Sequence, residues 1–168
     1  MKAYSSCVGD GPFTAELAMT EEEKHDLREA GHEYGAATGR PRRVGPIDLV
    51  ASRYGVFCQG CDEVALTLLD VLDYMEKIPM VTAYKLTDGS TTTRFPMGEA
   101  LDTAQPVVEY LPVGTVISPQ PASGKICPRK HAITWNIWKR LSAARSPTSL
   151  WVPSVRLIST TYDPLQSS

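Results

Sequence analysis

The sequence lacks long apolar runs, strong net charge and any excess of glycine or proline. Its 168 residues include 12 glycines and 13 prolines, too few for a collagen-like or low-complexity chain. The net charge of −2 gives no reason to expect a nucleic-acid binder, which needs a basic surface. There is no apolar run of about 18 residues and no apolar signal-peptide core. We therefore expect a globular cytoplasmic protein that binds neither nucleic acid nor a membrane.

Familiar nucleotide, nucleophile and metal motifs are missing too. The chain contains no Walker A sequence, no G-x-G-x-x-G and no G-x-S-x-G. Cys58 and Cys61 form a C-x-x-C pair, but Cys7 and Cys127 lack the spacing that a four-ligand zinc site needs. We predict no metal site from these cysteines.

The charges that are present divide unevenly after Pro112. Residues 1–112 hold 10 Lys and Arg against 18 Asp and Glu, whereas residues 113–168 hold 7 against 1. The second segment has no glutamate, contains all three tryptophans and shows no hydrophobic period. This change predicts two parts, residues 1–112 and residues 113–168, the second of them irregular or disordered.

The first part begins with patterns typical of a helix. Thr20 followed by three glutamates is a capping-box start, and Leu27 with Ala30 forms an apolar stripe before Gly31 ends the helix. These signals predict a helix over residues 21–31.

The middle of the chain predicts further elements of an α/β fold. The helical spacing of Ile47, Val50 and Tyr54 predicts a second helix that ends at Gly55. The continuous apolar run at 64–72 is typical of a strand buried on both faces of a parallel sheet. The remaining predictions are a hairpin of strands 80–87 and 91–96 around the turn 88–90, and a last strand at 107–112.

The strongest candidate site is the segment 35–43, GAATGRPRR. Its small residues let a loop approach a ligand closely. The guanidiniums of Arg40, Arg42 and Arg43 can each donate paired hydrogen bonds to a carboxylate or a phosphate. A solvated basic turn is the alternative, because charged runs usually face water.

Two further candidates are weaker. The glycine-rich turn at 5–12 has backbone N–H groups that can bind an anion, although a plain turn is the favoured interpretation. Asp70 is predicted at the carboxyl end of the strand 64–72, the edge at which open α/β sheets bind ligands. Its carboxylate can accept paired N–H donors, or it can simply cap a helix or form a salt bridge.

Three segments of this chain together resemble one known family. They are AYSSCVGDGPFTAEL, EYGAATGRPRRVGPIDLVASRYG and ALTLLDVLDYMEKIP. In order and spacing they resemble the C-terminal half of the adenylosuccinate synthetase family, over residues 2–112. The resemblance implies an α/β fold with the C-terminal part of a mostly parallel central sheet and flanking helices. It also implies the family's reaction in purine synthesis. There, GTP phosphorylates the 6-oxygen of IMP, and L-aspartate displaces the phosphate to give adenylosuccinate.

The resemblance implies roles for individual residues. The aspartate-binding loop would consist of Ala36, Ala37, Thr38, Gly39, Arg40, Pro41 and Arg42. Arg40 and Val8 would contact IMP, and Arg42, Leu68 and Leu69 would lie on the GTP side. Asp70 would accept the N1–H and the 2-amino group of guanine, which adenine does not offer.

The match to the family is partial. Leu68 stands where the family has a lysine whose stem covers the base, and Ala37 stands where many members have threonine. The family's glycine-rich phosphate loop, with its catalytic Asp and His, precedes the matched segment. We therefore assign no catalytic residue and no metal ligand to these 168 residues. The GTP, Mg²⁺ and homodimer of the family are implied by the resemblance alone.

We interpret residues 113–168 as an out-of-frame tail. If one base is missing near Pro112, joining the third base of each codon to the first two of the next recovers the original protein. In this shifted frame the codons of Trp135 and Asn136 can give only Glu, and so can those of Trp138 and Lys139. The codons of Trp151 and Val152 can give only Gly. These residues fall where the family has them. A natural, unrelated tail is the alternative.

Three functions remain open from the sequence. The chain is a truncated member of a GTP-dependent C–N ligase family that is not catalytic alone. It can also be a fragment that binds aspartate or a nucleotide or completes a separately encoded half of the enzyme, or the inactive product of a damaged gene.

Overall fold

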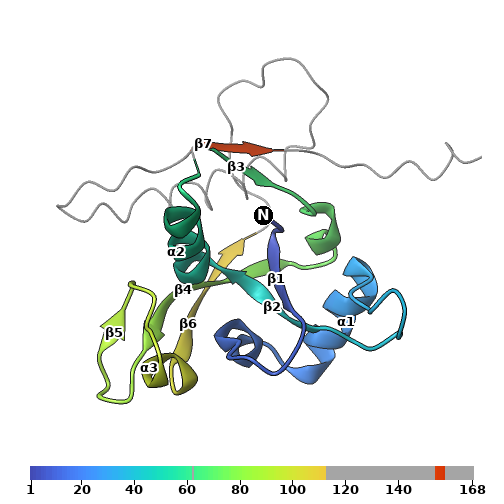
Figure 1. The fold of residues 1–168 in the computed structure, drawn as a ribbon. Helices are drawn as coiled ribbons and strands as arrows, with labels where there is room; N and C mark the ends of the chain where they lie inside the picture. Colours follow the sequence, from blue (N-terminus) through green and yellow to red (C-terminus); the bar gives the residue numbers. More distant parts are fainter. Residues whose placement is uncertain (62, 113–153, 158–168) are drawn as a thin grey trace, which may run out of the picture.

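The computed structural model describes residues 1–61, 63–112 and 154–157 (Figure 1). The strands are β1 (Tyr4–Cys7), β2 (Arg43–Asp48), β3 (Glu63–Leu66), β4 (Lys77–Lys85), β5 (Thr91–Thr92), β6 (Gln105–Pro112) and β7 (Ser154–Leu157). The helices are α1 (Glu21–Gly31), α2 (Leu49–Gln59) and α3 (Glu99–Asp102), with 3-10 turns η1 (Thr14–Ala18) and η2 (Asp70–Leu72). The α/β class expected from the sequence is confirmed.

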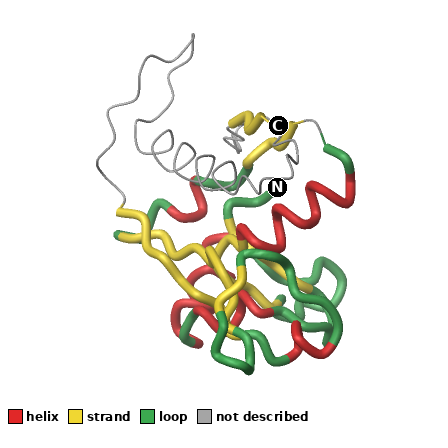
Figure 2. Tube along the Cα trace, turned by 90° about the vertical axis from the view of Figure 1, so that its left-hand side faces the viewer, coloured by secondary structure: helices red, strands yellow, loops and turns green. Residues whose placement is uncertain are grey.

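A five-stranded sheet forms the centre of the described part, in the order β1-β2-β4-β5 with β6 also paired to β4. β2 and β4 are parallel, whereas β1 pairs with β2, and β5 and β6 pair with β4, in the antiparallel direction. The sheet is therefore mixed in direction among the described strands. Figure 2 shows the strands passing through the middle with helical segments outside them.

Helix α1 confirms the capping-box prediction. The Thr20 hydroxyl accepts from the Glu23 backbone N–H at 3.2 Å, and the Glu23 carboxylate accepts from the Thr20 backbone N–H at 2.8 Å. Leu27 is fully buried as expected, but Ala30 is exposed, and the stem of Lys24 covers the core in its place. The helix ends where His32 adopts a left-handed conformation with φ of 49°.

The second predicted helix begins later and ends later than expected. Ile47 belongs to β2, and the helix starts only after Asp48, whose carboxylate accepts from the backbone N–H groups of Val50 and Ala51 at 3.0 and 2.9 Å. The prediction that Gly55 ends the helix is wrong, because Gly55 lies inside α2 and Gly60, with φ of 59°, caps it.

The predicted strand 64–72 is also wrong in its length. β3 ends at Leu66, and the chain then turns through Leu68, which has φ of 59°, into η2. The run is apolar because Leu66 at the end of β3, Leu69 before η2 and Leu72 at its end are all buried in one core cluster. Asp70 therefore lies on an exposed turn four residues after the strand.

The predicted hairpin and last strand are confirmed, but the second hairpin strand, predicted over 91–96, covers only Thr91–Thr92. β4 and β5 pair around the turn 88–90, where the Leu86 backbone N–H donates to the Ser90 carbonyl at 2.9 Å. β6 pairs with β4 from Gln105 to Pro112. The predicted tail lies outside the described residues, apart from the backbone of β7, which runs parallel to β3.

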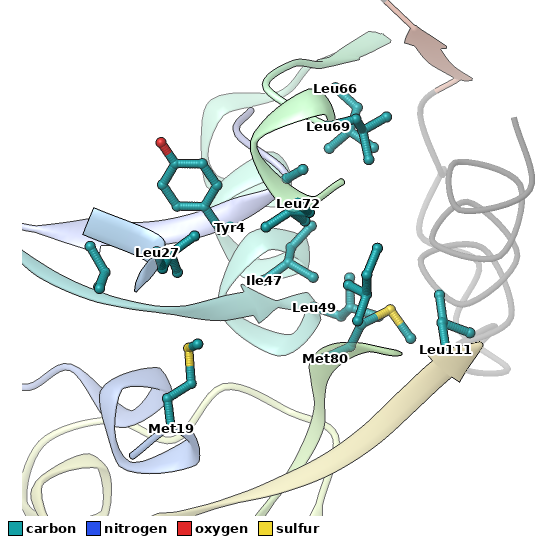
Figure 3. Close-up of a cluster of buried hydrophobic side chains, with 13 residues drawn as sticks. Tyr4, Met19, Leu27, Ile47, Leu49, Leu66, Leu69, Leu72, Met80 and Leu111 are labelled. Atoms are coloured by element: carbon teal, nitrogen blue, oxygen red, sulfur yellow. The ribbon is translucent and has the colours of Figure 1, made fainter. Parts of the chain in front are cut away.

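The main core lies between strands β1, β2 and β4 of the sheet and the segments α1 and η2. Figure 3 shows its apolar side chains facing one another, with the Tyr4 hydroxyl directed away from them. The buried members that it labels are Tyr4, Met19, Leu27, Ile47, Leu49, Leu66, Leu69, Leu72, Met80 and Leu111. This core fixes β1, α1 and η2 relative to one another, and the candidate site residues are attached to these elements.

Candidate functional site

The segment 35–42 is a closed loop between α1 and β2. The Gly35 backbone N–H donates to the Arg40 carbonyl at 2.9 Å, and the Gly39 N–H donates to the Gly35 carbonyl at 2.8 Å. Gly39 has φ of 63°, a conformation that a residue with a side chain rarely adopts. Residues 36–41 are exposed, so the structure presents this loop to solvent and not to the core.

The three arginines of the predicted fork have different surroundings. Arg40 is exposed, and its guanidinium forms no ion pair or hydrogen bond within the described ranges. Arg42 donates from Nη1 to Glu33 Oε2 at 2.9 Å. Arg43 is tied to Glu16 at 2.7 Å and lies over the Phe13 ring at 5.4 Å. Arg40 and Arg42 therefore remain candidates for ligand binding, whereas Arg43 serves the fold.

Arg43 also fastens the glycine-rich turn. Its Nη1 donates to the carbonyls of Gly9 and Gly11 at 3.1 and 2.7 Å, beside the register pair of Cys7 and Arg43. Val8 projects from this turn with 82% of its surface exposed. A cavity of about 310 Å³ adjoins the turn, and its lining includes Phe13, Glu16, Arg43 and Asp102 but none of residues 36–42.

Glu33 is the centre of a buried polar cluster that sequence reasoning missed. Its side chain is 2% exposed. Oε1 accepts from Lys2 Nζ at 2.5 Å and from the Tyr4 hydroxyl at 2.6 Å, and Oε2 accepts from Arg42. In the sequence, Glu33 is visible only as a glutamate between the end of the predicted helix and the basic loop. Its partners Lys2 and Tyr4 lie about 30 residues away in the chain.

Burial and hydrogen bonding act on these groups in opposite directions. Burial by itself raises the pKa of Glu33, but hydrogen bonds from Lys2, Tyr4 and Arg42 outweigh it and hold the pKa below its ordinary value. Burial and then the hydrogen bond to Glu33 raise the pKa of the Tyr4 hydroxyl. Glu33 is therefore the anion of the cluster and Tyr4 a neutral donor.

Arg42 and Asp70 both act electrostatically on Tyr4. The charge of Arg42 lowers the pKa of Tyr4, and the charge of Asp70 raises it, so both groups lie within electrostatic reach of this hydroxyl. Lys2 forms a parallel bridge with Thr67, which places the turn that carries Asp70 beside the start of β1. Arg40 and Asp70 form no ion pair with each other in the described chain.

The two leucines before Asp70 differ in what they can offer a ligand. Leu68 is half-buried in a left-handed conformation, and its side chain packs against the core. Leu69 is 4% exposed and belongs to the main core, so it supports the turn from within. Asp70 itself is exposed.

Cys58 and Cys61 lie at the end of α2, one exposed and one half-buried, with free thiols. Among the described residues there is no group of three His, Cys, Asp or Glu side chains that could hold a metal ion. We accordingly assign no Mg²⁺ ligands to this part of the chain. No helix in it is long and apolar enough to cross a membrane.

Comparison with known proteins matches residues 1–115 to the adenylosuccinate synthetase family model. The chain is 49% identical over 112 residues to the adenylosuccinate synthetase of Acidothermus cellulolyticus, and 45% identical over 115 residues to that of Symbiobacterium thermophilum. These alignments cover 66% and 67% of this chain and 26% of each relative.

The fold is similar to that of a solved relative as well. A fully ligated adenylosuccinate synthetase from Plasmodium falciparum superposes with a TM-score of 0.70 and 28% identity, covering 93% of this chain and 35% of that one. The chain thus spans about a quarter of the length of the curated relatives it matches. The family match over residues 1–115, at up to 49% identity, shows that this chain belongs to the adenylosuccinate synthetase family.

Proposed function

We propose that residues 1–112 are the aspartate- and nucleotide-binding part of an enzyme that joins IMP and L-aspartate at the expense of GTP. The observation that carries this proposal is the loop 36–42. It presents the Arg40 guanidinium without a partner among the described residues and Arg42 bonded to Glu33, on a chain of the adenylosuccinate synthetase family. The proposal includes the cytoplasmic location and the homodimer expected above.

The chemistry of the loop suits two anionic ligands. The Arg40 guanidinium donates to no residue in the part of the chain that the structure describes. A planar guanidinium matches a carboxylate such as that of aspartate, or a phosphate, through paired hydrogen bonds. The exposed small residues Ala36, Ala37 and Gly39 let the backbone approach the ligand closely. We propose that Arg40, together with the exposed turn at Val8, contacts IMP and aspartate.

The second ligand is the guanine nucleotide. The exposed carboxylate of Asp70 can accept two N–H donors of guanine, and Arg42 supplies a positive charge for its phosphates. Leu68 would add apolar contact to the base, and the buried Leu69 would hold the turn that carries Asp70.

These residues orient substrates but do not themselves transfer a phosphoryl group. Bound Mg²⁺ would neutralise phosphate charge during that transfer, and we assign neither its ligands nor a catalytic base to the described residues. We propose that the chain does not catalyse the ligation alone. A separately encoded polypeptide that supplies the phosphate loop would make it one half of a split enzyme.

Calorimetric titration of the purified chain with IMP, GTP and L-aspartate tests this proposal. We expect the wild-type chain to bind these ligands weakly. Arg40→Ala should reduce the affinity about tenfold, since a hydrogen bond to a charged group contributes about 1.5–3 kcal/mol. Arg94→Ala, which removes an exposed arginine near β5, serves as the matched control and should leave the affinity unchanged. An unchanged affinity in Arg40→Ala would contradict the assignment of the loop.

A further inference from the structure

We propose that Glu33 is a positioning residue that holds Arg42 by one edge, so that the remaining guanidinium donors face the nucleotide. The use of Arg42 toward a nucleotide rests on the proposed function above. The holding itself is argued from the described residues alone. Glu33 touches no proposed substrate atom, and its role is exerted through Arg42.

Two hydrogen bonds join these residues across the base of the loop. The Arg42 backbone N–H donates to the Glu33 carbonyl at 2.9 Å, and Arg42 Nη1 donates to Glu33 Oε2, also at 2.9 Å. The Arg42 side chain is 35% exposed, and its Nε is buried with no hydrogen-bond partner in the described chain. Glu33 is thus the anchor of this guanidinium, and without it the orientation of Arg42 is not determined.

Glu33 is itself fixed before any ligand arrives. Its carboxylate is buried, and its other oxygen is occupied by Lys2 and Tyr4 from the start of β1. Because two donors from the N-terminal segment hold one oxygen, the carboxylate presents its other oxygen to Arg42 in one geometry.

The charge of the cluster is suited to an anionic ligand. Two cations, Lys2 and Arg42, share the single negative charge of Glu33, which leaves an excess of one positive charge beside an exposed loop. A guanidinium has five N–H donors in a planar fork, and one bond to Glu33 leaves others for a phosphate. Holding the fork in advance lowers the entropy that the ligand must overcome to order it.

A purely structural role is the competing explanation. In that case Glu33 would only tie β1 to the end of α1, and its loss would destabilise the chain without a specific effect on Arg42. The two explanations differ in the behaviour of one side chain, which can be observed without any ligand.

The first measurement is the exchange of the Arg42 Nε proton with water, by NMR of the full chain with ¹⁵N-labelled arginine. We expect Glu33→Gln to speed this exchange about tenfold, because a charged hydrogen bond that restrains the guanidinium is weakened. Glu29→Gln is the matched control, since Glu29 lies in the last turn of α1, four residues before Glu33, and accepts from Tyr34 and not from an arginine. It should leave Arg42 unchanged. Unchanged exchange in a folded Glu33→Gln protein overturns the proposal.

If Glu33→Gln does not fold, Glu33→Asp replaces it. This variant keeps the charge but shortens the side chain by one methylene, so we expect an intermediate increase in exchange. No increase overturns the proposal.

The second measurement is GTP affinity by calorimetry. We expect Glu33→Gln and Arg42→Ala to weaken GTP binding by similar factors, about tenfold each, and the double variant to add little. If Arg42→Ala leaves GTP binding unchanged, or the wild-type chain binds no GTP, the proposed function of Arg42 fails. The exchange measurement still decides whether Glu33 holds it. If Arg42→Ala weakens binding but Glu33→Gln does not, the positioning role is overturned.

Discussion

Glu33 and Asp48 are both buried carboxylates, and their surroundings shift their pKa values in opposite directions. Glu33 is held ionised by two cations and a hydroxyl, which outweigh burial and lower its pKa. Its stabilising effect is present above its unfolded pKa and is lost as pH falls through the folded pKa. Burial raises the pKa of Asp48, because Tyr84 and the two backbone N–H groups of α2 only partly offset it. Its charged form therefore costs stability as pH rises above the ordinary value of 3.8.

The variant Asp48→Asn tests the direction of the pKa shift of Asp48. The amide oxygen can still accept from Val50 and Ala51, and the amide N–H₂ can donate to the Tyr84 oxygen. We expect Asp48→Asn to become more stable relative to wild type as pH rises from 3.8 through the folded pKa, because wild type alone must ionise a buried group. Urea denaturation at a series of pH values measures the difference.

Two further variants serve as controls for the Asp48→Asn measurement. Asp48→Ala should be less stable than Asp48→Asn by about 1–2 kcal/mol at every pH, because neither variant ionises at this position and Ala leaves α2 without its cap. The exposed Asp102→Asn removes the same charge from a solvated position and should show no such trend. A stability difference between Asp48→Asn and wild type that stays constant with pH would contradict the raised pKa.

At the scale of elements, the strand β2 shows why local patterns misled the prediction. Its sequence, RVGPID, contains a glycine and a proline and predicts no strand. It is nevertheless buried from Val44 to Asp48, between β1 and β4. The glycine is needed because η1 crosses the strand closely. A Cβ at Gly45 would lie 2.6 Å from the Ala15 carbonyl oxygen.

Gly45→Ala should therefore destabilise the protein by about 1–3 kcal/mol, since the atoms that must move belong to the backbone of η1. Gly55→Ala is the matched control. Gly55 lies inside α2, and a Cβ there meets nothing within 4 Å, so the same substitution should stabilise by about 0.5–1 kcal/mol. Midpoints of urea denaturation compare the two. Similar midpoints for both variants would show that η1 does not pack against β2 in solution.

At the scale of the whole molecule, the chain spans a quarter of its relatives' length and changes composition after Pro112. The family match ends at residue 115, close to this change. We propose that residues 1–112 are one structural unit and that residues 113–168 are translated out of frame. The residues available for chemistry are then those of the first part.

We predict that the pure polypeptide makes no adenylosuccinate from IMP, GTP and aspartate. Phosphoryl transfer needs a phosphate-cradling loop and charge neutralisation, and no such motif occurs among these 168 residues. Orientation by Arg40 and Arg42 lowers only part of the barrier. The test is a coupled assay on protein purified from a host without its own enzyme. GTP-dependent product above a no-protein blank would show that other residues supply the catalytic groups.

The out-of-frame interpretation has its own test. Restoring one base near the Pro112 codon should open a frame that encodes Leu-Pro-Gly-Trp and continues past the codons of Trp151 and Val152. Sequencing of the DNA decides this, because stop codons throughout that frame would exclude a lost base.

The sequence by itself determined the family, the α/β class, α1 with its capping box, the hairpin and the position of the basic loop. These features depend on residues that are close together in the chain, so the sequence pattern predicts them directly. Only the tertiary structure decided that Arg43 serves the fold, that Leu69 is a core residue, and that Glu33 meets Lys2, Tyr4 and Arg42. Such contacts join segments that are distant along the chain, and a sequence pattern does not record which of its charges will be buried opposite one another.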